Sequence, residues 1–137
     1  MSVYGYSILY AKIEGVNSTG KFNKNSVFES GDHRNFNRDG KYFDKGETFS
    51  GVDYETGLKA VEEIKKIFPD YKNLAPAALK WVLMFKDVSC VIPGASNANQ
   101  IDSNLEAESI PDISRKEMKE INNIYDKYIR SFVHDKW

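Results

Sequence analysis

The sequence predicts an α/β fold in which strands alternate with helices and pair in parallel. Residues 3–13 and 88–92 have the composition of strands, and the residues between and after them include segments with helical apolar spacing. A strand, helices, a strand and a helix in that order are typical of βα units with right-handed crossovers. Because two strands alone leave both sheet edges unpaired, we expect further strands from another chain segment or a partner copy.

The predicted single domain, residues 1–137, divides into a strand (1–13), a long loop (14–50) and a region of helices with one further strand (51–137). Residues 3–13 are rich in aromatic and β-branched side chains, which suit a buried or half-buried strand. Residues 14–50 are rich in Gly, Asn, Ser, Asp and Lys, and their aromatic residues follow no fixed period. Structureless loops of this length are usually functional or disordered, so this is a candidate functional loop.

Two helices are predicted between residues 53 and 86. Asp53 can cap the first, which Pro69 ends, and Glu62 and Lys66 are spaced to form a surface ion pair on it. The second occupies about residues 74–86, with Asn73 as its expected cap and a proline in its first turn. Apolar residues recur on one face of each helix, so both are expected to pack against a core.

The remaining elements follow the second predicted strand. Residues 88–92 are nearly continuously apolar, as in a parallel strand covered on both faces, so Cys90 is expected to be a small buried hydrophobe. A short helix begins near Asn97, with Ile101 and Leu105 expected to face inward.

The final helix opens with Ser114 and Glu117 in capping-box spacing. Its apolar residues share one face, which we expect to turn toward the core: Met118, Ile121, Ile124, Tyr125 and Tyr128.

Composition and charge exclude several classes of function. A formal net charge of -1 gives little attraction for nucleic acid or anionic membranes. No run approaches the roughly 20 apolar residues that cross a bilayer, and the N-terminus lacks a basic segment followed by an apolar secretory core, so a cytoplasmic protein is expected. Cys90 is the only cysteine, and no Cys/His cluster has zinc-ligand spacing, so we expect no disulfide and no metal site.

The segment with the most chemical information is residues 91–104. The predicted strand leads through Gly94 into a helix whose N-terminal N–H groups and dipole can hold a phosphate. Ser96 and Asn97 can donate side-chain hydrogen bonds, and Gln100 and Asn104 project from successive turns on one face. An ordinary strand-to-helix turn capped by Asn97 accounts for the same pattern, and spacing alone favours that interpretation.

The residues after Val91 resemble the aldo/keto reductase signature, in which the last barrel strand and its helix bind the adenosine and 2′-phosphate end of NADP(H): Ile92-Pro93-Gly94-Ala95, then Asn97, Gln100 and Asn104. Residues 79–83 resemble the helix before that strand, and residues 20–22 resemble the end of the family's cofactor loop after strand seven. Residues 129–137 resemble the tail of a bacterial-type subgroup. The resemblance covers nearly the whole chain, from about Tyr6 onward.

The resemblance implies the C-terminal part of a (β/α)₈ TIM barrel, with residues 6–12 as strand seven and 88–92 as strand eight. It also implies a set of cofactor-binding residues that would contact NADP(H): Gly94, Ala95, Ser96, Asn97, Gln100, Asn104, Gly20 and Lys21. In a full barrel the loop of residues 14–50 would lie over the cofactor, where its aromatic side chains could close as a lid.

The family's catalytic Asp, Tyr, Lys and His belong to earlier strands, so the resemblance assigns no catalytic residue to this chain. It therefore implies the C-terminal portion of an NADP(H)-dependent oxidoreductase for carbonyl and alcohol interconversion, inactive alone unless a complementing chain supplies the tetrad. A non-catalytic nucleotide-binding or structural remnant that forms homo-oligomers is the alternative, and a truncated product without a role of its own is a third.

Two departures from the family pattern concern the cofactor. Residues 13–20 differ from the usual loop after strand seven, which bears on the pyrophosphate contact. Many relatives carry Arg or Lys near the positions of Ser96 or Gln100, where this chain is neutral, so the choice between NADP(H) and NAD(H) stays open.

Neither histidine is expected to be catalytic. His33 follows Asp32 in a polar loop segment that shows no nucleophile, and His134 in the tail is expected to be a packed or hydrogen-bonded terminal residue.

Overall fold

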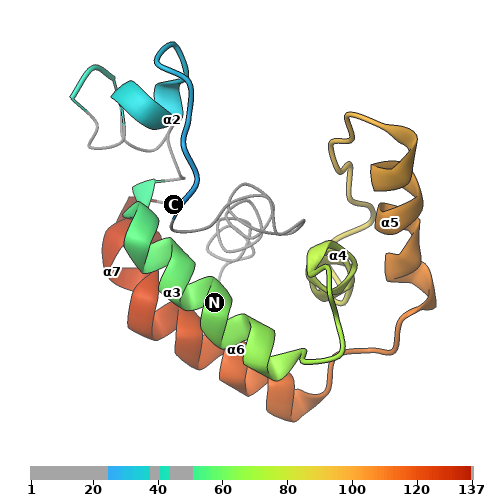
Figure 1. Cartoon of the computed structure of the whole chain (residues 1–137). Helices are drawn as coiled ribbons and strands as arrows, with labels where there is room; N and C mark the ends of the chain where they lie inside the picture. The colour runs from blue at the N-terminus through green and yellow to red at the C-terminus, as the bar shows by residue number, and fades with distance from the viewer. Residues whose placement is uncertain (1–24, 38–40, 44–50, 137) are drawn as a thin grey trace.

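The computed structural model describes residues 25–37, 41–43 and 51–136, and every regular element within these ranges is helical (Figure 1). The predicted strand at residues 3–13 and the candidate residues Gly20 and Lys21 lie outside the described residues. The elements in chain order are α2 (His33–Phe36), α3 (Tyr54–Ile67), α4 (Ala75–Leu83), α5 (Ala98–Ser109), α6 (Arg115–Tyr128), α7 (Arg130–Val133) and the 3-10 turn η3 (His134–Lys136).

The framework of the molecule is an antiparallel pair formed by α3 and α6, which lie side by side along their length (Figure 1). Two side-chain hydrogen bonds join them, because Glu63 Oε1 on α3 accepts from Lys127 Nζ at 2.9 Å and from Tyr128 Oη at 2.7 Å. The chain continues from α6 into α7, which lies near the start of α3 (Figure 1). Helices α4 and α5 pack against each other and form the other arm of the molecule.

The starts of α3 and α6 confirm the predicted caps. Asp53 Oδ2 accepts from the backbone N–H of Thr56 at 2.9 Å and from its hydroxyl at 3.0 Å. Ser114 and Glu117 form a complete capping box, in which Glu117 Oε2 accepts from Ser114 N at 2.7 Å and Ser114 Oγ accepts from Glu117 N at 3.2 Å. These bonds satisfy amide groups that have no partner within the helix.

Three details of the first helices differ from the sequence prediction. Glu62 pairs with Lys65, one residue before the expected Lys66, with the two charged atoms 2.8 Å apart. Helix α4 ends at Leu83 instead of near residue 86, and the chain continues in turns. The N-cap of α4 is Leu74 instead of the expected Asn73, although Asn73 Oδ1 accepts from Ala75 N at 3.0 Å.

The main core lies where α3, α4 and α6 meet, and α7 closes one end of it. The inward face predicted for the last helix is confirmed, because Ile121, Ile124 and Tyr125 are buried and Met118 and Tyr128 pack against them. The buried members of this core are Val52, Ala60, Val61, Ile64, Phe68, Leu74, Ala78, Trp81, Ile113, Ile121, Ile124, Tyr125, Ile129 and Val133.

The prediction of a buried strand at residues 88–92 is wrong for this structure. The segment has no regular secondary structure, Ile92 is 92% exposed, and Cys90 is exposed instead of buried. A strand is stabilised by hydrogen bonds to a neighbouring strand, and the part of the chain that the structure describes places no strand beside these residues. The apolar composition predicted that other elements would cover both faces of this segment, and the described structure shows no such cover.

The inward face predicted for α5 is also wrong. Ile101 and Leu105 are 53% and 63% exposed, and Ala107 is the buried residue of this helix. Helix α5 is attached to the rest of the molecule through contacts with α4 and through Asn73 Nδ2, which donates to Ser103 Oγ at 2.7 Å.

The long loop contains one ordered turn of helix in its described part. Asp32 caps α2, accepting from Arg34 N at 2.8 Å, and its carboxylate also accepts from Arg34 Nε at 2.9 Å. The Arg34 guanidinium lies over the ring of Phe28, 4.9 Å from its centroid. Phe28 in turn packs with Tyr54 and Leu58, which connects this part of the loop to α3.

None of the helices in the described ranges is both long enough and apolar enough to cross a membrane. Across those same ranges, no group of three or more His, Cys, Asp and Glu side chains is arranged to hold a metal ion.

Candidate functional site

The segment predicted to bind a nucleotide is an exposed loop tied to the first two turns of α5. Asn97 is the N-cap, and its Oδ1 accepts from Gln100 N at 3.1 Å. Gln100 Oε1 turns back and accepts from Ser96 N at 2.6 Å and from Ser96 Oγ at 3.0 Å. Asn104 Nδ2 donates to the carbonyl oxygen of Gly94 at 3.5 Å, at the long limit of a hydrogen bond.

These bonds bring together five of the predicted cofactor residues, with Ala95 between them. Each of these bonds joins two residues of the segment itself. The sequence pattern showed that Gln100 and Asn104 share a face, but it did not show that both reach back to the loop that precedes their own helix. The local geometry thus supports the capped-turn interpretation and leaves the loop preformed.

The electrostatics of this turn come from the backbone. Residues 94–104 contain no Lys or Arg, and Asp102 is their only charged residue. The positive end of the α5 helix dipole faces solvent. The first turn of α5 carries no acidic side chain, so no carboxylate there would repel a bound anion. An anion at this end would be held by N–H groups and the dipole, at an exposed site where each is weak.

Gly94 leaves open space at the turn. A methyl group built on its Cα would meet no heavy atom within 4 Å, so the fold itself places no steric demand for glycine there. Room beside the backbone is what close approach of a ligand requires.

A groove of about 560 Å³ lies between α4 and the second half of α5. Asn104 and Leu105 form its α5 side, and Lys80 on its α4 side is held by Asp112, with 3.1 Å between Nζ and Oδ1. The sequence pattern did not predict this groove, because Lys80 and Asp112 are far apart in the chain and no local spacing rule links them. The full lining is Lys80, Leu83, Met84, Asn104, Leu105, Ala107, Glu108 and Asp112.

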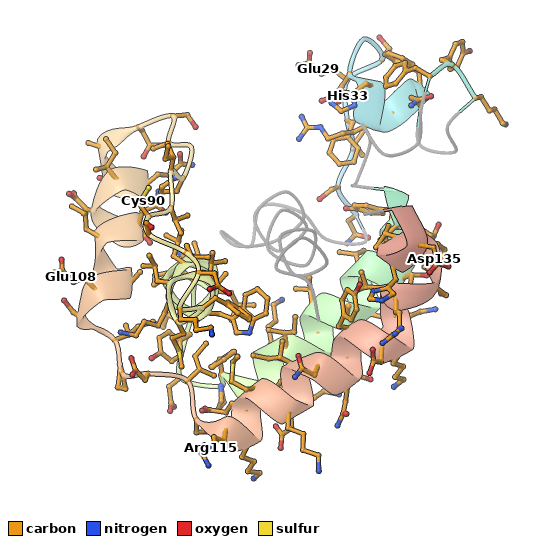
Figure 2. The ribbon with its side chains drawn as sticks, turned by 180° about the vertical axis from the view of Figure 1, so that it is seen from behind. Glu29, His33, Cys90, Glu108, Arg115 and Asp135 are labelled. Carbon is orange, nitrogen blue, oxygen red and sulfur yellow. The ribbon has the colours of Figure 1, made fainter. Side chains whose placement is uncertain are left out.

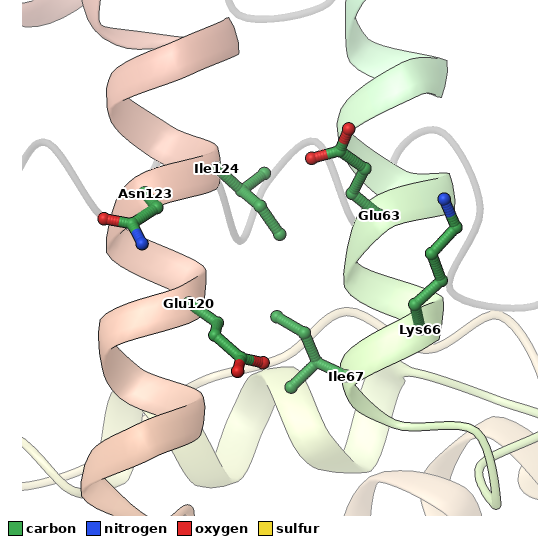
Figure 3. A pocket seen from close by; sticks show the side chains of 6 residues that line it. All are labelled: Glu63, Lys66, Ile67, Glu120, Asn123 and Ile124. Atoms are coloured by element: carbon green, nitrogen blue, oxygen red, sulfur yellow. The ribbon is translucent and has the colours of Figure 1, made fainter.

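A second, smaller groove of about 300 Å³ runs between α3 and α6 (Figure 3). Ile67, Ile124 and Glu120 extend between the two helices, whereas the Lys66 side chain points away from α6. Hydrogen bonds from Lys127 and Tyr128 lower the pKa of Glu63, which borders the groove, so this carboxylate serves the contact between the helices. The groove shows no combination of nucleophile, base and orienting group.

The remaining perturbed groups have structural partners. The side-chain hydrogen bond from Arg34 lowers the pKa of Asp32 to about 2. Burial raises the pKa of Tyr125, whose hydroxyl lies 3.0 Å from His134 Nδ1, so the expectation that His134 is hydrogen-bonded is confirmed. His33 is the first residue of α2, and its ring lies 6.2 Å from that of Phe43.

Three aromatic residues in the described part of the loop contact one another at the end of α2. The ring of Phe36 makes edge-on contacts with those of Tyr42 and Phe43, with centroids 5.5 Å and 6.0 Å apart. Figures 1 and 2 place α2 and α5 on opposite sides of the molecule. The described part of the loop therefore does not cover the turn at Gly94, and the lid stays a prediction.

Comparison with known proteins gives one match. The model of the aldo/keto reductase family matches residues 6–126, which is most of the chain. No curated protein and no solved structure matches the chain.

Proposed function

The chain belongs to the aldo/keto reductase family, and from this premise we propose that residues 94–104 form the adenosine-binding part of a nicotinamide dinucleotide site. The family is one of oxidoreductases that generally use NADP(H) and suggests a barrel of the TIM type. The observation that carries the proposal is the preformed turn at α5, with open space at Gly94 and an N-terminal helix end that no first-turn carboxylate opposes.

In this proposal the residues of the turn have separate roles. The backbone at Gly94 and Ala95 lies against the ligand, and the exposed amides at the start of α5 face its phosphate. Gln100 holds Ser96 in place, while Asn104 reaches the loop from the next helical turn. The bound dinucleotide supplies hydride for the interconversion of a carbonyl compound and an alcohol. This chain contributes binding and orientation to that reaction.

In this proposal, residues outside this chain carry out the proton transfer. The resemblance assigns none of the family's catalytic Asp, Tyr, Lys and His to a residue of this chain. We therefore propose that residues 1–137 alone do not reduce carbonyl compounds. Strands that carry the tetrad would have to come from other sequence, such as a complementing chain. Turnover of an aldehyde with NADPH by the pure chain would contradict this proposal.

Discrimination between the two dinucleotides is expected to be small. A 2′-phosphate is usually held by Arg or Lys through charge-assisted hydrogen bonds, whereas Ser96 and Gln100 are neutral and bond to each other. We therefore expect NADPH and NADH to bind with affinities within about tenfold of each other, a difference of about 1.4 kcal/mol.

A structural role is the second candidate function, and a specific observation favours it. Ile92, Ile101 and Leu105 are all more than half exposed in the segment from residue 92 to α5. Exposed apolar side chains that form one continuous patch are typical of surfaces that a partner covers. A non-catalytic protein that forms homo-oligomers through this arm would explain them without any cofactor.

The test is a fluorescence titration of NADPH against the purified chain, with size-exclusion chromatography on the same samples. Asn104→Ala and Asn99→Ala make a matched pair, since both lie on α5 and the Asn104 side chain reaches Gly94. We expect saturable binding by the native chain and by Asn99→Ala, and binding weaker by about tenfold in Asn104→Ala. Absence of saturable binding by the folded chain would reject the cofactor site, and an oligomer in that case would favour the structural role.

A further inference from the structure

Helix α5 presents an exposed apolar pair on the side away from its buried residue. Ile101 and Leu105 are both more than half exposed, whereas Ala107 is buried. At about 100° per residue, Ala107 lies roughly 140° around the helix from the midpoint of the pair. On α4, Leu83 is also exposed and borders the same groove as Leu105, which extends the apolar surface. Within the described ranges, no element covers the apolar pair.

The charges of α5 lie at the end of the helix where its own dipole disfavours them. The helix has three acidic residues, Asp102, Glu106 and Glu108, and no Lys or Arg. Glu106 and Glu108 lie in the last turn, at the negative end of the dipole, and the first turn carries no acidic side chain. Figure 2 shows that Glu108 projects from α5 into solvent. One end of α5 is therefore negative and the other end is positive.

We propose that α5 packs antiparallel against α5 of a second copy of the chain. In this arrangement the acidic last turn of each helix lies beside the positive first turn of the other, so the two disfavoured ends stabilise each other. The apolar pair is centred on residue 103, close to the midpoint of Ala98–Ser109. Packing about that point places Ile101 level with Leu105 of the second copy. It also places Glu108 level with Ala98 of the second copy.

A second copy fits this surface because the surface is complementary to itself. A two-fold axis through the centre of the pair brings the same patch of both chains together, as in other isologous dimers. Glu108 lies about 40° around the helix from the midpoint of the pair and so borders the contact, whereas Glu106 lies about 120° away. A parallel pair would instead place the two acidic turns side by side, where like charges repel each other.

The contact is small, so we expect the association to be weak. A helix of 12 residues is about 18 Å long. One pair of such helices buries less surface than a stable dimer normally does, so the dissociation constant should lie roughly between 10 and 500 μM. The pairing develops the structural role described above as the second candidate function, and it does not depend on the cofactor site.

Sedimentation equilibrium of the full chain without nucleotide, at about 5 to 500 μM, tests the pairing. The native chain should show a monomer–dimer equilibrium. Leu105→Gln removes the apolar contact, and Glu108→Lys reverses the charge beside the first turn of the second copy. Because a two-fold axis repeats each contact, either substitution should weaken the dimer by about tenfold. Glu108→Lys also puts a cation at the C-terminal end of its own helix, which should stabilise α5, so its effect cannot result from unfolding.

Two matched variants control for these changes. Val27→Gln removes an exposed apolar side chain outside α5, and Glu106→Lys makes the same charge change on the other side of α5. Both should weaken the dimer by less than about threefold. A chain that stays monomeric at every concentration would overturn the proposal, as would a dimer that neither Leu105→Gln nor Glu108→Lys weakens. Because no nucleotide is present, either result leaves the cofactor site to be judged by the NADPH titration.

A charge exchange tests the antiparallel orientation. Ala98→Glu adds a carboxylate level with Glu108 of the second copy, so it should weaken the dimer although it favours its own helix. Combined with Glu108→Lys, it places opposite charges at both ends of the contact. The combined variant should therefore regain at least the native affinity, about tenfold above that of Glu108→Lys alone. In a parallel pair each substituted position would meet its own copy, and failure to regain affinity would contradict the antiparallel orientation.

Discussion

Replacing two isoleucines that differ in exposure tests the described packing most directly. Ile121 on α6 is 4% exposed within the main core, whereas Ile101 on α5 is 53% exposed. The sequence pattern predicted that both face inward. Ile121→Ala and Ile101→Ala remove the same atoms, so the difference between their effects on the free energy of unfolding reports the environment of each side chain.

The two expected magnitudes differ severalfold. Each substitution removes three carbon atoms, and full burial of each contributes about 0.8 kcal/mol of transfer free energy, or roughly 2.5 kcal/mol in all. At Ile121 the cavity left in the core adds to this, so we expect a loss of about 3 kcal/mol. At Ile101 about half of the transfer term applies, and the better helix propensity of alanine offsets about 0.4 kcal/mol of it. The net loss there should stay below about 1 kcal/mol.

The assay is urea unfolding followed by far-UV circular dichroism, which reports helix content. If unfolding is two-state, the free energy of unfolding should fall with urea concentration at the same slope in the native chain and both variants. The urea concentrations at the midpoints of unfolding then give the change in stability. A loss at Ile101→Ala as large as that at Ile121→Ala would refute the reasoning. It would mean that a further layer covers α5, as the expected barrel requires.

Three further changes test individual contacts. Ser114→Ala should destabilise the chain by about 1 kcal/mol in urea unfolding, because it removes half of the capping box, and no change would contradict the cap. Order in α2, followed by NMR, should persist above the ordinary aspartate value and be lost as the pH falls through about 2, since the bond from Arg34 lowers the pKa of Asp32 to that value. Asp32→Asn should disorder α2 at all pH values. Glu63→Gln should reduce the salt dependence of unfolding by weakening the contact with Lys127, and an unchanged dependence would show that this ion pair adds nothing.

Helix starts were predictable because their signals are local. Asp53 and Ser114 each bond to an amide within three residues, so the sequence contains everything that the cap needs. The core face of α6 was equally predictable, because a stripe of large apolar residues on a long helix has one side to bury. In each case the information lies within one turn or one helix.

The errors fall where a segment depends on distant partners. The apolar residues at 88–92 and the pair on α5 indicate burial only if another layer covers them, and the described structure places none there. A strand pattern states which residues suit a sheet but not whether a sheet is present. The contact between Lys80 and Asp112 was missed for the same reason, since no local rule links residues so far apart.

The conformation of the turn before α5 was predicted in part. The pattern located Gly94, Asn97 and Gln100 at a helix start, and the structure brings them into one turn. The bond from Gln100 back to Ser96 was not predicted, because the direction of a side chain depends on the loop conformation. The resemblance and the family match identified membership in a reductase family. The spacing of residues alone could not identify it.

The pairing of α3 with α6 has a consequence for the order in which the chain folds. Helices α4 and α5 contact each other across the connection of residues 84–97, whereas α3 and α6 must close the longer loop of residues 68–114, which contains both of those helices. The entropy lost on closing a loop grows with its length, so the contact between α4 and α5 is expected to form early and the long-range pair late. Substitutions between α3 and α6 should then mainly accelerate unfolding and leave the refolding rate nearly unchanged. The contact that holds the core together would in this way set the lifetime of the folded chain.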